Sequence, residues 1–235
     1  MSEEQVIVTG ASRGIGAAIA AELGRGGFTV AALSRSGQTA TGYSLVCDVS
    51  DESSLSQAVE CVAARGPIVG LVNNAGGHFA SPSRDLSAAE FERAMRLNAT
   101  SVVVACREAY PHLVAAGGGL IVNIGSFFDK LAVPENVGYC ASKAAVGAIT
   151  RCLASEWAKD NIRVLDVAPG YIETDLNRDF LASDKIRTWL AKRAPVGRAG
   201  RPEEIARLVG VLFREQIGFL TGETIYVDGG QGVNY

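Results

Sequence analysis

Short apolar runs rich in β-branched residues alternate with segments of helical periodicity along the whole chain. This alternation is typical of βα units arranged around a parallel sheet. Because the runs are apolar at nearly every position, helices must cover both faces of the sheet, and right-handed crossovers then give a doubly wound order. The expected strands are residues 6–9, 29–33, 44–47, 68–73, 120–124, 162–168 and 224–227.

The segments between these strands carry signals for the start of a helix. Ser87 and Glu90 have the spacing of a capping box, and Pro202 stands where the first residue of a helix is expected. No linker, repeat or low-complexity block interrupts the pattern, so we expect one α/β domain over residues 1–235. The expected helices lie near residues 15–25, 53–64, 88–115, 139–159 and 203–213.

One long segment, residues 171–201, is polar and charged and lies between the sixth strand and the last helix. Long irregular connections in compact domains are often functional, so a mobile substrate lid is one interpretation. A pair of ordinary surface helices is the other. In both interpretations the segment begins at the carboxyl end of the sixth strand, and ligands bind at the carboxyl ends of strands in doubly wound sheets.

The charge and length of the chain exclude some classes of function. Its 235 residues suit one α/β domain with a substantial core. A nucleic-acid partner usually requires a basic face, and the formal charge of -3 argues against one. The acidic start Met1-Ser2-Glu3-Glu4 leads directly into a strand-like run, and no apolar run has the length of a membrane helix. We therefore expect a cytoplasmic protein with no membrane partner.

The cysteines and histidines show no pattern of a metal or redox site. No two cysteines have CxxC spacing, and His78 and His112 lack the spacing of a ligand pair. We therefore expect no metal and, because most of the cysteines fall inside apolar segments, buried free thiols. The cysteines are Cys47, Cys61, Cys106, Cys140 and Cys152.

A glycine-rich turn follows the first expected strand and opens the first expected helix. It reads Thr9-Gly10-Ala11-Ser12-Arg13-Gly14-Ile15-Gly16. Glycines permit a tight turn and a close approach of the backbone to pyrophosphate, whose charge is favoured by the amides and dipole at a helix N-terminus. A glycine cluster alone is weak in a chain with 27 glycines, but its place between strand and helix predicts a dinucleotide site.

With four further motifs, this turn resembles the short-chain dehydrogenase/reductase family. The turn matches TGxxxGxG, and the others are Asp48, Asn73-Asn74-Ala75-Gly76, Pro169-Gly170-Tyr171-Ile172-Glu173-Thr174 and Tyr226-Val227-Asp228-Gly229-Gly230, in the family's order. The resemblance covers essentially the whole chain and implies a Rossmann fold with a nicotinamide cofactor. The cofactor-binding residues that it implies are Gly10, Ser12, Arg13, Gly14, Ile15, Gly16, Ser34, Arg35, Asp48, Val49, Asn74, Ala75, Gly76, Pro169, Gly170, Ile172 and Thr174.

Tyr139 and Lys143 are four residues apart, so on a helix they project from one face. A free tyrosine has a pKa of about 10, and acid–base work near neutrality requires a stabilised phenolate. The ammonium of Lys143 supplies that charge, so we expect a lowered pKa for Tyr139. The resemblance implies that Lys143 also binds the nicotinamide ribose, that Ser126 holds the substrate carbonyl, and that Asn98 supports a water relay behind the lysine.

Together these residues predict an oxidoreductase that interconverts a ketone and a secondary alcohol, with Tyr139 as proton donor. A non-catalytic NAD(P)-binding sensor or scaffold is a remote alternative, because such relatives lose catalytic residues. Enoyl reductases of the family space the tyrosine and lysine further apart. Sugar-nucleotide epimerases are longer and use a different glycine spacing, so both are disfavoured.

Within the family, residues 167–175 most resemble 3-oxoacyl-[acyl-carrier-protein] reductases. Carrier protein is acidic, and a docking surface for it should be basic. Those reductases commonly carry lysine or arginine just before the fifth strand, where this chain has Ala115-Ala116-Gly117-Gly118-Gly119. We therefore favour a freely diffusing ketone or alcohol and keep a substrate attached to acyl-carrier protein as the alternative.

Two features depart from the family pattern. Asp166 lies in the segment before the Pro169–Gly170 pair, where asparagine is common, and we expect it to alter local hydrogen bonding rather than chemistry. Phe127 and Phe128 replace a smaller, glycine-containing segment. They line an apolar pocket or pack against the segment at 171–201, and the sequence favours neither.

The end of the second strand predicts the choice of cofactor. NAD-preferring relatives carry an acidic residue there, which binds the adenine ribose, whereas this chain has Ser34 followed by Arg35. Ser34 does not repel a 2′-phosphate, and Arg35 and Arg13 can make charge-assisted contacts with it. We therefore expect NADP(H) to be preferred over NAD(H).

Small residues in the helix near 139–159 predict self-association. Relatives commonly pair their fourth and fifth helices across a two-fold axis, and Ala144, Ala145, Ala148 and Ala154 permit close packing there. We expect a homotetramer, or at least a dimer.

Overall fold

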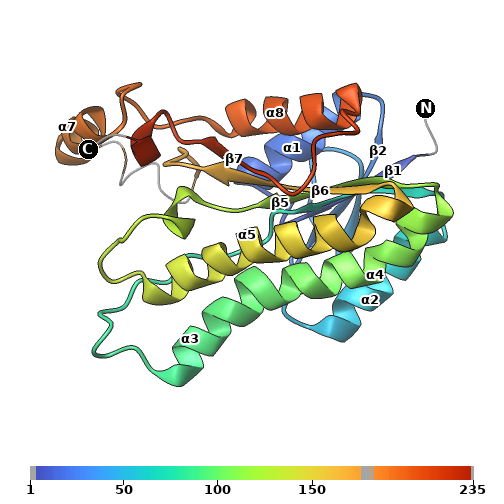
Figure 1. Cartoon of the computed structure of the whole chain (residues 1–235), viewed down its shortest axis with the longest axis horizontal. Helices are drawn as coiled ribbons and strands as arrows, with labels where there is room; N and C mark the ends of the chain where they lie inside the picture. The colour runs from blue at the N-terminus through green and yellow to red at the C-terminus, as the bar shows by residue number, and fades with distance from the viewer. Residues whose placement is uncertain (1–3, 176–180, 182, 234–235) are drawn as a thin grey trace.

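The computed structural model describes residues 4–175, 181 and 183–233, and its centre is one sheet of seven parallel strands in the order β3-β2-β1-β4-β5-β6-β7 (Figure 1). The chain starts in the middle of the sheet and builds outward in both directions, so the doubly wound parallel sheet expected from the sequence is confirmed. The strands are β1 Gln5–Thr9, β2 Thr29–Ser34, β3 Tyr43–Val46, β4 Ile68–Asn73, β5 Gly119–Ile124, β6 Ile162–Pro169 and β7 Thr224–Val227.

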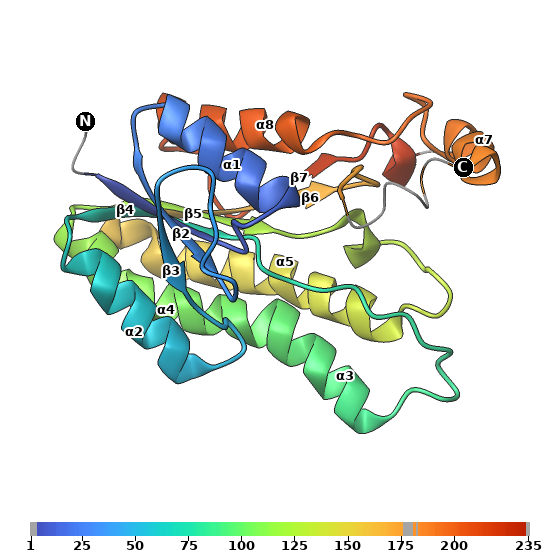
Figure 2. The ribbon, with the colours of Figure 1, turned by 180° about the vertical axis from the view of Figure 1, so that it is seen from behind.

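Helices cover both faces of this sheet. Figures 1 and 2 show α1 and α8 on one face and α2, α4 and α5 on the other. Within the described ranges, no helix is long and apolar enough to cross a membrane. The helices are α1 Gly14–Arg25, α2 Glu52–Ala63, α3 Ala88–Met95, α4 Ser101–Ala115, α5 Val137–Trp157, α7 Asp184–Arg193 and α8 Pro202–Glu215.

Successive strand residues pack into opposite cores, which explains why the strands are apolar throughout. In β4, Leu71 joins the core under α2, α4 and α5, while Val72 joins the core under α1 and α8. In β5, Ile121 and Val122 divide in the same way. Side chains of a strand alternate between its two faces, so a sheet covered on both sides buries every position.

The local signals in the sequence place most element boundaries correctly. The expected strands agree with the structure to within one residue at each end. Ser87 and Glu90 form the expected capping box, in which the Ser87 Oγ accepts from the Glu90 amide at 3.2 Å and the Glu90 carboxylate accepts from the Ser87 amide at 2.9 Å. Pro202 is the first residue of α8, as expected.

The single helix expected over residues 88–115 is wrong in one respect. A π-helical turn, Arg96–Thr100, separates α3 from α4. Such turns occur often at functional sites, and this one contains Asn98. Helix continues on both sides of it, and no glycine or proline within it marks the insertion in the sequence.

The segment from 171 to 201 is more regular than its composition suggests. It contains α7, whose N-cap Ser183 accepts a hydrogen bond from the Ile186 amide at 3.3 Å. A parallel bridge joins Ile172 to Gly200, so the two ends of the segment lie together. Residues 176–180 and 182, part of the expected lid, lie outside the described residues.

The expectation of buried thiols is correct for only part of the cysteines. Cys47 and Cys106 are buried, and Cys140 is half-buried. Cys61 and Cys152 are exposed, because they lie on the solvent faces of α2 and α5. All five are free thiols.

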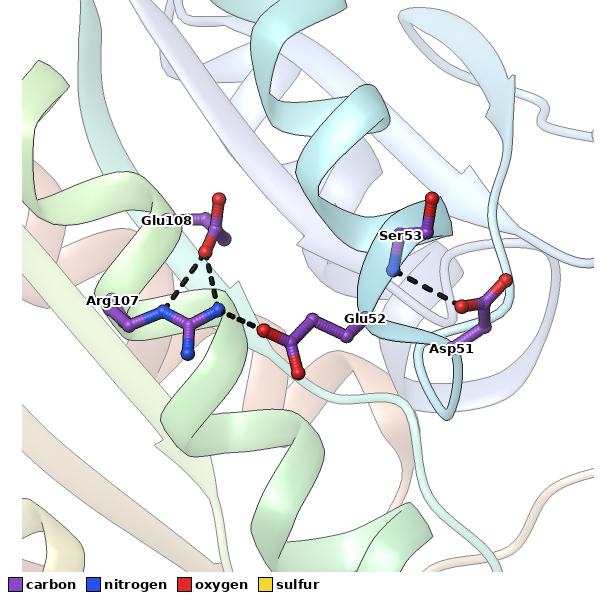
Figure 3. A network of polar contacts seen from close by, with 5 residues as sticks. All are labelled: Asp51, Glu52, Ser53, Arg107 and Glu108. Atoms are coloured by element: carbon purple, nitrogen blue, oxygen red, sulfur yellow. Dashed lines mark hydrogen bonds and ion pairs between the residues drawn. The ribbon is translucent and has the colours of Figure 1, made fainter.

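An ion-pair network on the surface joins α2 to α4 (Figure 3). The Arg107 guanidinium contacts the carboxylates of Glu52 and Glu108, each at 2.6 Å. Beside it, Asp51 caps α2 by accepting from the Ser53 amide at 3.1 Å. These groups are exposed, so the pairs contribute little to stability, but they hold the start of α2 against α4.

A buried chain of hydrogen bonds between two asparagine amides and a threonine hydroxyl connects two strands to α5. The Asn73 side chain donates to the Asn123 Oδ1 at 2.9 Å, and the Asn123 Nδ2 donates to the Thr150 Oγ1 at 2.9 Å. Asn123 and Thr150 are fully buried. Because buried polar groups are costly when unpaired, this chain fixes α5 against β4 and β5.

Replacing Asn123 with alanine should lower the free energy of unfolding by about 1–3 kcal/mol, because Asn73 and Thr150 each lose a buried partner. Urea denaturation of the parent and the variant measures this. Gln57→Ala is the matched control, since the hydrogen bond from the Gln57 amide to Ser53 is exposed. It should change stability by less than about 0.5 kcal/mol. Equal effects of the two substitutions would contradict the role assigned to the buried chain.

Candidate active site

The glycine turn between β1 and α1 has the backbone that its sequence requires. Gly10 and Gly14 have φ of 67° and 58°, in the left-handed region that favours glycine. Ser12 and Arg13 are exposed on the turn at the N-terminus of α1, where amides and dipole favour an anion. The turn can therefore hold a pyrophosphate group.

Thr9 and Asn74 fasten this turn to the end of β4. The Thr9 Oγ1 accepts from the amides of Asn74 and Ala75, both at 3.0 Å. The Asn74 Nδ2 donates in return to the carbonyls of Thr9 at 2.9 Å and Gly10 at 3.2 Å. A Cβ on Gly16 would lie 2.4 Å from both the Asn74 Nδ2 and the Gly10 oxygen, so only glycine fits there.

The residues expected at the adenine end follow β2 and β3. Ser34 ends β2 and is buried, with its Oγ 3.3 Å from the Ser36 Oγ. The Asp48 carboxylate accepts from the Ser50 amide and hydroxyl at 2.9 and 2.7 Å. Hydrogen bonds from Ser50 lower the pKa of Asp48, and the nearby charge of Arg35 adds to the effect. Val49 is buried in the core, so it supports this end through packing.

The segment after β6 returns toward the glycine turn. The Thr174 Cγ2 lies 3.4 Å from the place of a Cβ on Gly14, which brings the two expected cofactor segments together. Gly170 packs so closely on Asp228 that a Cβ there would meet the Asp228 Cα at 2.7 Å. Ile172 is buried under the α1 and α8 face. A groove of about 520 Å³ runs between the starts of α1 and α8 and residues 173–175.

Asn98, in the π-helical turn, is buried and joins the loop after β4 to α5. Its Oδ1 accepts from the Gly77 amide at 2.9 Å, and its Nδ2 donates to the Gly77 carbonyl at 2.9 Å and to the Ser142 Oγ at 3.1 Å. Gly76 lies directly above, since a Cβ on it would be 3.0 Å from the Asn98 Oδ1 and 3.9 Å from the Lys143 Nζ. The structure thus brings together the expected relay residue and the expected lysine.

Lys143 is buried, and its Nζ donates to the Ile124 carbonyl at 2.7 Å. Burial lowers the pKa of Lys143 to about 8, and the neighbouring charge of Asp166 opposes that change. The Nζ lies 5.8 Å from the centre of the Tyr139 ring. Lys143 is therefore a cation whose proton is held less tightly than usual, close to the phenol.

The lowered pKa expected for Tyr139 is wrong for the protein alone. Burial raises the pKa of Tyr139 above its ordinary value, while a hydrogen bond with Ser126 acts in the opposite direction. The Lys143 ammonium points at the Ile124 carbonyl instead, so its charge is not directed at the phenol. Ser126 and Tyr139 nevertheless lie together, as the sequence predicts, at the end of β5 and the start of α5.

Comparison with known proteins places the chain among dehydrogenases and reductases. The family model described as Enoyl-(Acyl carrier protein) reductase matches residues 10–231. The 3beta-hydroxysteroid dehydrogenase 1 of Eggerthella lenta is 35% identical over 96% of this chain and 92% of its own length. Gluconate 5-dehydrogenase of Gluconobacter oxydans is 33% identical over 98% of this chain and 95% of its own length.

A solved structure has the same fold throughout. The gluconate 5-dehydrogenase of Burkholderia cenocepacia, in complex with NADP and tartrate, superimposes with a TM-score of 0.91 at 30% identity and covers 100% of this chain and 97% of that one. The chain belongs to the short-chain dehydrogenase/reductase family. It is an oxidoreductase of the family's type, whose named members act on alcohols and carbonyl compounds.

Two neighbours of the expected site in this short-chain dehydrogenase/reductase carry no clear signal in the sequence, and a third, Asp166, stands out there only as a departure from the family pattern. Ser142 accepts from Asn98 and donates to the Tyr139 carbonyl at 2.8 Å, yet it reads as an ordinary helix residue. The His78 ring packs on Tyr139 with centroids 4.9 Å apart, and its position two residues after Gly76 is the one available hint. Asp166 is fully buried next to Lys143, which no local pattern predicts.

Proposed function

We propose that the chain is an NADP(H)-dependent oxidoreductase that interconverts a ketone and a secondary alcohol, with Tyr139 as general acid and base. The observation that carries the proposal is that Ser126, Tyr139 and Lys143 lie together at the carboxyl ends of the strands, where the glycine turn also lies. The bound nicotinamide supplies or accepts the hydride.

Each of these residues has a role that fits its position. The Ser126 hydroxyl holds the substrate oxygen, and Tyr139 gives that oxygen its proton when the carbonyl is reduced. Lys143 binds the nicotinamide ribose and holds a positive charge near the phenol. Asn98 keeps Gly77 and Ser142 in place behind the lysine, where a proton relay to solvent would start.

The four-residue spacing of Tyr139 and Lys143 supports carbonyl reduction rather than reduction of an enoyl double bond, although the matching family model is described as an enoyl reductase. One turn of α5 separates the two side chains.

We expect ketone-dependent oxidation of NADPH in a screen that follows nicotinamide absorbance. A complete lack of turnover across a broad panel of ketones and alcohols would instead support a non-catalytic role.

Residues at the ends of β1 and β2 support a preference for NADP(H). The last residue of β2 is Ser34 rather than an acidic residue. Arg13, on the glycine turn, and Arg35, just after β2, are both exposed. A 2′-phosphate on the adenine ribose would receive charge-assisted hydrogen bonds from these guanidinium groups. A gluconate 5-dehydrogenase of the same fold was solved with NADP.

Replacing Ser34 with aspartate and Arg35 with glutamine should lower the ratio of kcat/KM for NADPH to that for NADH by about 100-fold or more. A charge-assisted hydrogen bond contributes roughly 1.5–3 kcal/mol, and the new carboxylate repels the phosphate. Steady-state kinetics with both cofactors measures the ratio. Arg84→Gln is the control, because Arg84 is an exposed arginine paired with Asp85. Equal efficiency with both cofactors in the parent enzyme would contradict the proposed preference.

We further propose that residues 171–201 form a substrate lid within one domain over residues 1–235.

The enzyme would work in the cytoplasm, where its cofactor exchanges freely, as a homotetramer or at least a dimer. Ala144 and Ala148 are exposed on α5 and Val103 is 42% exposed on α4, which suits pairing of these helices. Ala154, expected in the same contact, is buried in the core of its own chain. A monomer in light scattering at micromolar concentration would contradict the assembly.

A further inference from the structure

Aromatic side chains form a continuous series of ring contacts that starts at Tyr139. The Tyr139 ring packs edge-on against His78 and Phe128, with centroids 4.9 and 5.6 Å apart. Phe128 contacts Tyr171 at 6.2 Å, and Tyr171 contacts Trp189 at 5.5 Å. Phe127 packs beneath, 5.3 Å from Tyr171. We call these six residues, His78, Phe127, Phe128, Tyr139, Tyr171 and Trp189, the aromatic wall.

The aromatic wall is built from five segments that meet around Tyr139, which itself lies in α5. His78 comes from the loop after β4, Phe128 from the short helical turn after β5, Tyr171 from the loop after β6, and Trp189 from α7. Phe127 and Phe128 are almost fully buried, whereas His78 is exposed and Trp189 is 38% exposed. The buried members therefore hold a surface whose outer members face solvent.

The chemistry of this wall suits an apolar ring rather than a charged chain. Aromatic rings prefer edge-to-face and offset contacts with other apolar groups. The six residues include no lysine or arginine, and the guanidinium of Arg193 that stacks on Trp189 at 5.7 Å is three ring contacts away from Tyr139. A carboxylate held near Tyr139 would find no lysine or arginine in the wall to pair with its charge, and only the neutral donors of tyrosine and tryptophan and the imidazole of His78.

We propose that the substrate is a ketone, or the matching secondary alcohol, whose carbonyl belongs to or adjoins an apolar ring system that rests on the aromatic wall. This inference depends on the proposed oxidoreductase function and deepens it. The ring contacts with Tyr171 bear out the packing of Phe127 and Phe128 against the segment at 171–201, and the proposal assigns the same surface to the substrate. Polyhydroxylated acids and carrier-bound acyl chains fit the wall poorly.

Kinetics with two matched ketones tests the inference. With NADPH, kcat/KM should be at least about 100-fold higher for a bicyclic ketone such as a tetralone than for a polyhydroxylated keto acid of similar size. One methylene group in an apolar pocket changes kcat/KM by about 10–200-fold, and a ring system makes more apolar contacts than one methylene group. A higher value for the keto acid would overturn the substrate class and leave the oxidoreductase function intact. Turnover of neither ketone, nor of other members of a broad panel, would count against the function itself.

Trp189→Ala separates the aromatic wall from general effects on catalysis. Trp189 forms the outer end of the wall, and its ring contact is with Tyr171 rather than with Tyr139. The variant should therefore raise KM for the bicyclic ketone about 10-fold or more with little change in kcat. Small cyclohexanone should be affected much less. Phe219→Ala is the control, because Phe219 is fully exposed on the loop before β7. An unchanged KM for the bicyclic ketone in Trp189→Ala would remove α7 from the substrate site.

A second and independent observation concerns Asp166, which is fully buried in β6. The Thr224 Oγ1 donates to its Oδ2 at 3.3 Å, and the Gly125 backbone amide also favours the charged carboxylate. Among the residues that the structure describes, the Oδ1 has no partner of full hydrogen-bond geometry. The carboxylate lies against the backbone just before Ser126, since a Cβ on Gly125 would meet its Oδ1 at 2.4 Å. Burial raises the pKa of Asp166 to about 6, and the charge of Lys143 opposes that change.

Among the described residues, Lys143 is the cation whose charge acts on the Asp166 carboxylate, although the Arg151 guanidinium also lies near Thr224. The Lys143 Nζ, from α5, lies 2.7 Å from the carbonyl of Ile124, the residue directly before the Gly125 backbone against which the carboxylate packs. Thr224 faces the carboxylate from β7. The carboxylate of Asp129, after β5, repels it, and Asp129 itself accepts from the Tyr226 hydroxyl at 2.7 Å. A half-paired buried carboxylate is expensive unless a nearby positive charge compensates it. Lys143 is the group that does so.

We infer that Asp166 is a positioning residue that keeps Lys143 protonated, and with it the cofactor-binding state of the site. Removing the carboxylate charge leaves the buried ammonium uncompensated, so Lys143 should lose its proton at lower pH. Binding of NADPH, which uses this ammonium at the ribose, should then weaken at lower pH. The sign follows from the two groups: burial favours neutral Lys143, and Asp166 opposes it.

The test measures the NADPH dissociation constant by nicotinamide fluorescence from pH 6 to 10. In Asp166→Asn, the alkaline loss of affinity should move down by about one pH unit relative to the parent. Thr224→Val is the matched control, because it removes the hydrogen bond but keeps the charge, and its profile should match the parent. Asp166→Ser serves in the same test if the asparagine variant does not fold. Superimposable profiles for the parent and the charge-free variant would overturn the inference.

Discussion

The mutual hydrogen bonds of Thr9 and Asn74 set the geometry on which the rest of the site depends. They join the glycine turn after β1 to the end of β4, the two strands at which the order of the sheet reverses. Chains leave this point in opposite directions, which opens a crevice at the carboxyl ends of the strands. The contact leaves no room for a side chain at Gly16. With glycine there, Asn74 can hold the turn in place, and the backbone of the turn stays accessible to a phosphate group.

The second part of the site depends on how α5 is attached. Asn123 binds Thr150 near the middle of the helix, Lys143 binds the Ile124 carbonyl, and Ser142 binds Asn98. These buried contacts fix the first turns of α5 beside the end of β5, which brings Tyr139 to Ser126. Burial then acts on the two titratable side chains in opposite senses. It raises the pKa of the phenol and lowers that of the ammonium, because in both cases it disfavours the charged form.

The sequence predicts the strands and most helices because their signals are local: apolar runs, the Ser87 capping box and Pro202 at the start of α8. The Tyr139–Lys143 pair is also predictable, since four residues make one helical turn. The π-helical turn around Asn98 is not, because residues 96–100 contain no glycine or proline and helix continues on both sides of them. Likewise, the pKa of Tyr139 depends on burial and on the direction of the Lys143 side chain, and the aromatic wall joins five segments that are separate in the sequence. Such properties arise only after the chain has folded.

Transfer of a proton from the Tyr139 phenol is the central step of the proposed reaction, and single-turnover hydride transfer measures it most directly. Enzyme loaded with NADPH is mixed with an accepted ketone, and the loss of nicotinamide absorbance is followed in the parent and in Tyr139→Phe. The variant lacks only a hydroxyl, so it should fold and bind NADPH as the parent does. Its rate should fall by about 10²–10⁴, the usual contribution of a positioned acid. A rate within a factor of a few of the parent would show that the proton comes from another group.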